Sequence, residues 1–164
     1  THDYEEALVL ANKVAVINQG KIVQSGPAEE VFHNPGSEFV ARFTGVKNYF
    51  AARLYREQDR QYGELENGQV LRLNTEEPEG KGFAILRGED IFISLENLPT
   101  SATNQMKGLI LEISPSPFGF EVLVDTGTRF YARITRESLQ NLALREGKEI
   151  WISFKAANVK FVRV

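Results

Sequence analysis

The chain has 164 residues, a net charge of −3, no cysteine, 42% apolar residues and 25% charged residues. This composition is typical of an ordinary globular protein of one or two domains. The lack of cysteine excludes disulfides, thiolate catalysis and cysteine-ligated zinc. No apolar run reaches the roughly 18 residues of a membrane-spanning helix, and no signal peptide precedes the first helical run. These features fit a cytoplasmic protein.

The charge is distributed unevenly along the chain. Residues 1–98 contain 10 basic and 16 acidic side chains, whereas residues 99–164 contain 9 basic and 6 acidic ones. A mildly basic C-terminal part would tolerate an anionic ligand, although scattered surface lysines and arginines would give the same asymmetry. It lacks the dense basic face that a nucleic-acid partner requires, so no such partner is expected.

The first 45 residues predict short helices and one hairpin. Asp3 is a candidate N-cap of a first helix, because a carboxylate there can accept the free N–H groups of the first turn. Gln19-Gly20 joins two short apolar runs as a tight turn would. Ser37 is a candidate cap for a later helix. The remaining elements expected here are the strands Val14–Asn18 and Lys21–Gln24 and the helices Ala28–Phe32 and Glu38–Phe43.

From Asn48 onward, short strand-like runs recur with turn residues between them, which is typical of an all-β barrel or sandwich. One helix, Arg136–Leu142, interrupts them, with Thr135 as its candidate cap. The expected strands are Tyr49–Tyr55, Gln69–Leu73, Gly82–Leu86, Ile91–Leu95, Leu109–Ile113, Glu121–Asp125, Phe130–Ile134, Glu149–Phe154 and Val159–Val164.

A weak internal repeat favours two similar β units. A shift of 59 residues aligns Gly68 with Gly127 and Gly88 with Gly147, and R-G-E-D-I-F-I-S then faces E-G-K-E-I-W-I-S. Solenoids and duplicated domains show self-similarity of this kind. Ordinary strand chemistry after a turn glycine would produce part of the same match, so both explanations stay open.

Residues 1–45 resemble the end of an ABC importer ATPase domain. The matching pieces are T-H-D-x-x-E-A, V-A-V-I-N-Q-G-K-I-V-Q-x-G, A-E-E-V-F-x-x-P and F-V-A-x-F-x-G. In that family the histidine of T-H-D contacts the γ-phosphate of ATP and helps to position the attacking water. The resemblance assigns this catalytic role to His2, where an imidazole N–H would stabilise transferring phosphoryl oxygen.

The sequence contains no G-x-x-x-x-G-K-[ST] segment, which would hold the phosphates. We therefore expect ATP and Mg²⁺ to bind only in the full-length parent and His2 to be inactive in this fragment. The purified chain should show no ATP turnover above a blank without protein, and measurable turnover would contradict this. The apolar side chains of Leu8, Leu10, Val14, Val16 and Ile22 are expected to pack on the β region or on a second copy.

Residues 101–163 resemble the TOBE or Mop-type oxyanion-binding regulatory domain. The matching pieces are S-A-T-N-Q-x-K-G, A-R-I-T-x-x-S, L-x-L-x-x-G and F-K-A-A-x-V, and R-G-E-D-I at Arg87–Ile91 resembles the R-P-E-D-I element of TOBE-bearing ATPases. The resemblance implies a small tetrahedral oxyanion held by Ser101, Thr103, Asn104, Lys155 and Ala156. Hydroxyls, an amide, backbone N–H groups and one ammonium suit a dianion.

One position departs from the family pattern, since Ala157 stands where a hydroxyl residue often follows Lys-Ala and one donor is lost. A purely structural role is the alternative for the same residues. Asn104 could fix a turn, and Lys155 could simply point outward from a strand. No metal site is expected, because His33 has no acidic or histidine partner nearby in the sequence.

The sequence thus predicts a mainly β chain, with an OB-like or Mop-like β-barrel regulatory domain and short helices, preceded by a small α/β remnant of the ATPase domain. The expected boundaries are 1–45 and 46–164, with possible β units at 46–98 and 99–164. The resemblance implies the C-terminal regulatory part of an importer ATPase subunit for molybdate, tungstate or sulfate. It implies a homodimer through the β domain, permease partners and a peripheral place on the inner membrane face. The alternative is a non-sensing dimerisation domain of a sugar, polyamine or ferric-iron importer.

Overall fold

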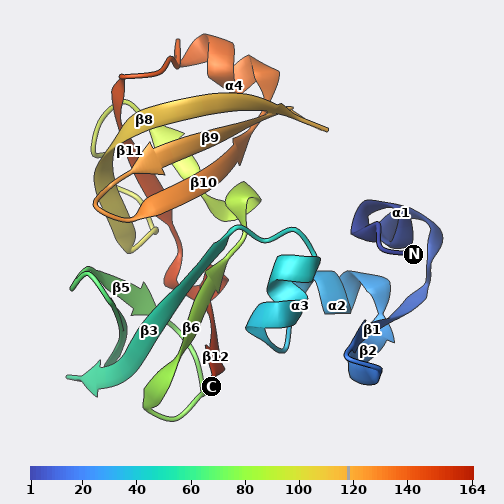
Figure 1. The fold of residues 1–164 in the computed structure, drawn as a ribbon. Helices are drawn as coiled ribbons and strands as arrows, with labels where there is room; N and C mark the ends of the chain where they lie inside the picture. The colour runs from blue at the N-terminus through green and yellow to red at the C-terminus, as the bar shows by residue number, and fades with distance from the viewer. Residues whose placement is uncertain (118) are drawn as a thin grey trace.

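The computed structural model describes residues 1–117 and 119–164, and within these ranges the chain folds mainly into β strands (Figure 1). The helices are short and lie at the N-terminus and beside the sheets. Over the described residues, no helix has the length and apolar character needed to cross a lipid bilayer. The predicted mainly β fold with short helices is confirmed.

Residues 1–45 form a small α/β unit whose helix starts are set by side-chain caps. The Asp3 carboxylate accepts hydrogen bonds from the N–H groups of Glu5 at 2.9 Å and Glu6 at 3.1 Å, as predicted. The Ser37 hydroxyl accepts one from Val40 N–H at 3.2 Å. The elements of this unit are α1 (Tyr4–Leu10), β1 (Lys13–Asn18), β2 (Lys21–Pro27), α2 (Ala28–His33) and α3 (Glu38–Phe43).

The remaining strands form two antiparallel sheets, which lie one above the other in Figure 1. Sheet I has the order β12-β6-β3-β4-β5 and consists of β3 (Asn48–Glu57), β4 (Arg60–Leu65), β5 (Val70–Leu73), β6 (Gly80–Leu86) and β12 (Lys160–Arg163). Sheet II has the order β10-β9-β8-β11-β7 and consists of β7 (Phe92–Ser94), β8 (Asn104–Ser116), β9 (Gly119–Asp125), β10 (Arg129–Ile134) and β11 (Glu149–Phe154). The short helices η1 (Gly88–Asp90) and η2 (Ala156–Asn158) connect the two sheets, and α4 (Arg136–Asn141) lies between β10 and β11 of sheet II.

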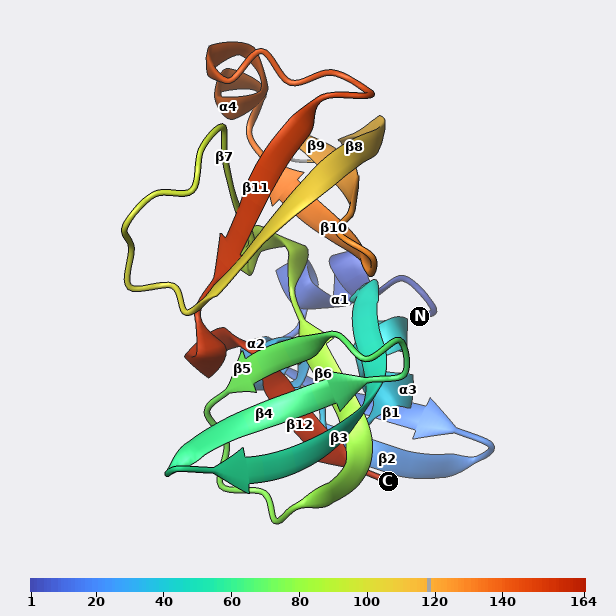
Figure 2. The same cartoon turned by 90° about the vertical axis from the view of Figure 1, so that its left-hand side faces the viewer.

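The two sheets exchange strands. β7 follows β6 in the chain but pairs with β11 of sheet II, and β12 follows β11 but pairs with β6 of sheet I. Figure 2 shows the chain crossing twice between the sheets, once through β7 and once through β12. Each sheet therefore contains an edge strand from the other segment of the chain, and neither can form completely without the other.

Strands β3–β7 and strands β8–β12 follow the same order and pair in the same way. The residues that correspond in the two sets differ, however, from those that the 59-residue shift aligns. Asn48 on β3 faces Leu86 at the end of β6, and Asn104 on β8 faces Phe154 at the end of β11. Gly88 after β6 thus corresponds to Ala156 after β11, and its predicted alignment with Gly147 is wrong. The physical reason is that α4 and its loop are inserted before β11, which displaces the later strands. Similar turn-plus-strand chemistry produced the misleading match.

A shared hydrophobic core fills the space between the sheets. Leu54 and Leu86 of sheet I and Ile110 and Phe154 of sheet II are at most 1% exposed. The ring of Phe130, on β10, lies 5.1 Å from the ring of Phe50 and 5.7 Å from that of Phe154, measured between centroids. Since Phe50 belongs to sheet I and Phe154 to sheet II, Phe130 contacts aromatic side chains of both sheets.

The sequence did not predict β4, which pairs with β3 through a two-residue turn. The turn residues Gln58 and Asp59 have φ values of 49° and 59°. In a sequence, Asn-Gly or Gly-Gly usually indicates such a type I′ turn, because most non-glycine residues tolerate positive φ poorly. With neither glycine nor asparagine at these two positions, the turn carried no sequence signal.

The apolar side chains of the N-terminal unit behave differently from one another. Val16 is 4% exposed and packs with Val31, Val40 and Val14 inside this unit. Leu8, Leu10 and Ile22 are 41%, 75% and 65% exposed, so the expectation that they pack on the β region within one chain is wrong. The reason is that α2 and α3 stand between β1 and sheet I (Figure 1). Packing on a second copy stays a prediction.

Candidate anion-binding site

Asn104 begins β8 and is 4% exposed. Its amide nitrogen donates to the carbonyl oxygen of Arg72 at 3.0 Å, and its amide oxygen accepts from the N–H of Arg72 at 2.8 Å. Arg72 lies on β5, the edge strand of sheet I. The side chain therefore pairs with an edge strand as a neighbouring strand would, and it ties sheet II to sheet I. One of its two amide hydrogens makes this bond, and an amide group has a second one to donate.

Lys155 and Ala156 lie beside Asn104. Phe154 is paired with Asn104 across β11 and β8, and the next residue, Lys155, is the N-cap of η2. Lys155 is exposed and Ala156 is half-buried, and η2 packs against β5. The structure thus brings the two distant sequence pieces to the same end of two adjacent strands, next to the edge of the other sheet.

Ser101 and Thr103 lie in the loop that leads into β8, and both side chains are exposed. Between them Ala102 is 6% exposed, and its carbonyl accepts a hydrogen bond from the Gln105 amide at 3.2 Å. The buried alanine anchors the loop, and the flanking hydroxyl residues face solvent.

A second arrangement of the same kind lies at the opposite strand ends, around Asn48. The Asn48 amide nitrogen donates to the carbonyl oxygen of Tyr131 at 2.8 Å, and its oxygen accepts from the N–H of Tyr131 at 2.7 Å. Tyr131 lies on β10, the edge strand of sheet II. Arg87 takes the place of Lys155, because it follows Leu86, the partner of Asn48, and is the N-cap of η1.

Charges around Asn48 are largely compensated. Lys47 Nζ lies 2.6 Å from Glu121 Oε1, and Arg87 Nε lies 2.8 Å from Glu89 Oε1. Burial alone would raise the pKa of Glu89, but the hydrogen bond and charge of Arg87, with smaller help from Arg133, hold it below its ordinary value. At Lys155 no carboxylate lies within ion-pairing distance among the described residues. Lys155 therefore has no ion-pair partner among the described residues, whereas its counterpart Arg87 is paired with Glu89.

Residues 100–161 match the model of the TOBE domain. The C-terminal part of the chain is therefore similar to a TOBE domain. The matched range includes all five residues that the sequence singled out for anion binding, Ser101, Thr103, Asn104, Lys155 and Ala156.

Two curated relatives align with nearly the whole chain. The molybdate/tungstate import ATP-binding protein WtpC of Pyrococcus abyssi is 35% identical over 98% of this chain and 45% of its own length. The sulfate/thiosulfate import ATP-binding protein CysA of Bacillus cereus is 33% identical over 97% of this chain and 44% of its own length. The chain thus spans less than half the length of these relatives. Together they confirm the predicted resemblance to importer ATP-binding subunits of the molybdate, tungstate and sulfate type.

A solved structure shares the fold of most of the chain. It is the cytoplasmic molybdate-binding protein ModG with molybdate bound, which superimposes with a TM-score of 0.62 over 73% of this chain and 98% of its own. At 19% identity this likeness shows the fold alone. It confirms the predicted Mop-like architecture.

Sequence reasoning missed three residues around the TOBE domain. Asn48 and Arg87 repeat the geometry of Asn104 and Lys155. A shift of the sequence by 56 instead of 59 residues aligns G-V-K-N with S-A-T-N and would have identified Asn48. Arg72 gave no signal, although its guanidinium lies over the Tyr62 ring at 5.2 Å and its buried Nε has no hydrogen-bond partner among the described residues. His2 is exposed in the N-terminal segment, and no hydrogen bond joins it to the other residues singled out here among those that the structure describes.

Proposed function

We propose that this chain is the C-terminal regulatory part of the ATP-binding subunit of an ABC importer for molybdate- or tungstate-type oxyanions. In this proposal the β sheets mediate dimerisation and sense the oxyanion. The whole subunit binds ATP and Mg²⁺, works with permease subunits and lies on the inner face of the cell membrane. The observation that supports it most is the alignment of nearly the whole chain with a molybdate/tungstate import ATP-binding protein.

The chemistry of the site suits a small dianion. Lys155 supplies an ammonium without a carboxylate partner among the described residues, and Ser101 and Thr103 supply hydroxyl donors in an exposed loop. Lysine acts as a point charge, which favours a compact tetrahedral anion over a planar carboxylate. The structural role of Asn104 does not compete with binding, because an amide nitrogen has a second hydrogen to donate. Ala157 supplies no hydroxyl, which makes the site one donor poorer than the family pattern.

A thermal shift measurement tests the sensing proposal. An anion that binds the folded chain but not the unfolded one raises the free energy of unfolding by about 2.7 kcal/mol at a concentration of one hundred times its Kd. For a chain of this size that is a rise in Tm of roughly 5–10 °C. We expect such a rise with molybdate or tungstate, and a loss of most of it in Lys155→Gln.

The matched control is Lys107→Gln, which removes the same charge from an exposed lysine that pairs with Glu149 at 3.3 Å. It should keep the anion-dependent rise. If the unaltered chain shows no shift at millimolar molybdate, tungstate or sulfate, sensing is excluded and the dimerisation-only alternative stands. Dimerisation itself is measured separately by sedimentation velocity, where a monomer at all concentrations would exclude it for this chain.

A further inference from the structure

The N-terminal unit meets the two sheets at a small hollow beside Asn48. Tyr4, the first residue of α1, lines this hollow, and about 20 Å³ of free volume remains in it. That is room for about one water molecule. The other side chains and backbone that close it come from the end of α3, the start of β3, the end of β6 and β10, and include Gly45, Lys47, Arg87 and Arg133.

The phenol of Tyr4 fills the place that a side chain at Gly45 would need. Gly45 has a φ of 81°, and a methyl group built on it would overlap the Tyr4 hydroxyl oxygen and its ring carbon. On its other side the Tyr4 ring packs against Phe32 with 6.2 Å between centroids. Burial, followed by the neighbouring Glu5 carboxylate, raises the pKa of Tyr4 above its ordinary value.

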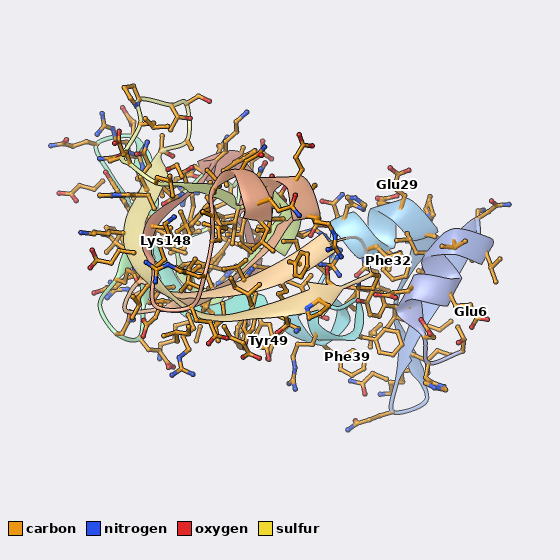
Figure 3. The ribbon with its side chains drawn as sticks, turned by 90° about the horizontal axis from the view of Figure 1, so that it is seen from above. Glu6, Glu29, Phe32, Phe39, Tyr49 and Lys148 are labelled. Carbon is orange, nitrogen blue, oxygen red and sulfur yellow. The ribbon has the colours of Figure 1, made fainter. Side chains whose placement is uncertain are left out.

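Arg87 holds the other side of this contact. Its Nη1 donates to the carbonyl oxygen of Phe32, near the C-terminal end of α2, while its Nε pairs with Glu89. The Arg87 side chain is 17% exposed and Phe32 is 3% exposed. Figure 3 shows Phe32 on α2, between α1 and the sheets. One residue of the sheet region therefore fixes the helix against which Tyr4 packs.

The position of α1 determines where His2 lies. Asp3 caps α1 through the N–H groups of Glu5 and Glu6, and the Asp3 N–H donates to the Thr1 hydroxyl at 3.1 Å. His2 lies between these two linked residues. A displacement of Tyr4 from the hollow would release α1 and the segment that contains His2, because none of the α1 residues is buried.

We propose that Tyr4, Gly45 and Arg87 form a latch through which the sheet region fixes the segment that contains His2. Tyr4 is then a positioning residue for His2. The catalytic meaning of this positioning rests on the proposed function, but the latch itself does not. A rearrangement around Asn48 and Arg87 would be transmitted to His2 through Phe32 and Tyr4.

The chain has no cysteine, so introduced cysteines can be labelled uniquely. Val9→Cys on α1 and Glu137→Cys on α4 are both at exposed positions and take nitroxide labels. Double electron–electron resonance, without ATP or oxyanion, then measures the distance between α1 and α4, the helix between β10 and β11 of sheet II. We expect one narrow distribution in the parent and a broadened one in Gly45→Ala, whose methyl group displaces Tyr4.

The matched control is Gly68→Ala, since Gly68 has a φ of 85° and nothing within 4 Å of an added methyl group. It carries the same backbone strain and should leave the distribution narrow. Tyr4→Ala, which adds no backbone strain, should broaden it as Gly45→Ala does. The latch is refuted if both Gly45→Ala and Tyr4→Ala keep the parent distribution, or if Gly68→Ala broadens it equally. Because no anion is present, this result is independent of whether the chain senses oxyanions.

Discussion

Asn104→Ala is expected to lower the free energy of unfolding by about 3 kcal/mol. The substitution removes two hydrogen bonds, worth about 1 kcal/mol each, and leaves the N–H and C=O of Arg72 without their partner at a partly buried position. Asn104→Asp should lose nearly as much, because a carboxylate cannot donate to the Arg72 carbonyl. Urea denaturation followed by circular dichroism measures both.

The control for Asn104→Ala is Asn141→Ala, at an exposed position on α4, which should change stability by less than about 0.5 kcal/mol. Asn48→Ala should cost as much as Asn104→Ala, since Asn48 is 1% exposed and pairs with Tyr131 in the same way. A loss below about 1 kcal/mol in both buried variants would show that the two asparagines do not tie the sheets together.

Phe130→Ala is expected to cost about 3–5 kcal/mol, the usual range for removing a buried phenylalanine ring. Phe130 is 0% exposed, and its ring lies against Phe50 of sheet I and Phe154 of sheet II. The cavity would open between two sheets that are fixed to each other by exchanged strands, so it cannot collapse easily. Thermal and urea unfolding give the value.

Phe92→Ala serves as the comparison, because Phe92 lies on the edge strand β7 and is 60% exposed. It should cost less than about 1 kcal/mol. If Phe130→Ala were as mild as Phe92→Ala, the core would not be shared between the sheets. A folded Phe130→Ala variant with two separate unfolding transitions would contradict a shared core as well.

Local chemistry made much of the fold predictable. The caps Asp3, Ser37 and Thr135 each start a helix where the sequence placed one, because a side-chain oxygen and the free N–H groups of a first turn are neighbours in the chain. Strand β11 and helix α3 have the predicted bounds. Strand β8 begins at Asn104, five residues before its predicted start. The prediction missed these residues because a polar loop and a polar strand end have the same sequence pattern.

Long-range pairing was not predictable from one sequence. Strands β7 and β12 each pair with an edge of the other sheet, and this choice depends on contacts between segments far apart in the chain. No local sequence pattern predicts it. The same limit applies to the site. Family resemblance pointed to Asn104 and Lys155, and the strand register places them together. The bond from Asn104 to Arg72, 32 residues away in the chain, had no sequence signal.

A crystal structure of the chain grown with tungstate, whose tungsten gives strong anomalous scattering, tests the proposed oxyanion site most directly. We expect an anomalous peak within hydrogen-bonding distance of Lys155 and of Ser101 or Thr103, with the Asn104–Arg72 pair intact. A structure at saturating tungstate with no peak at this place, or with its peaks only elsewhere on the surface, would contradict the proposed oxyanion site.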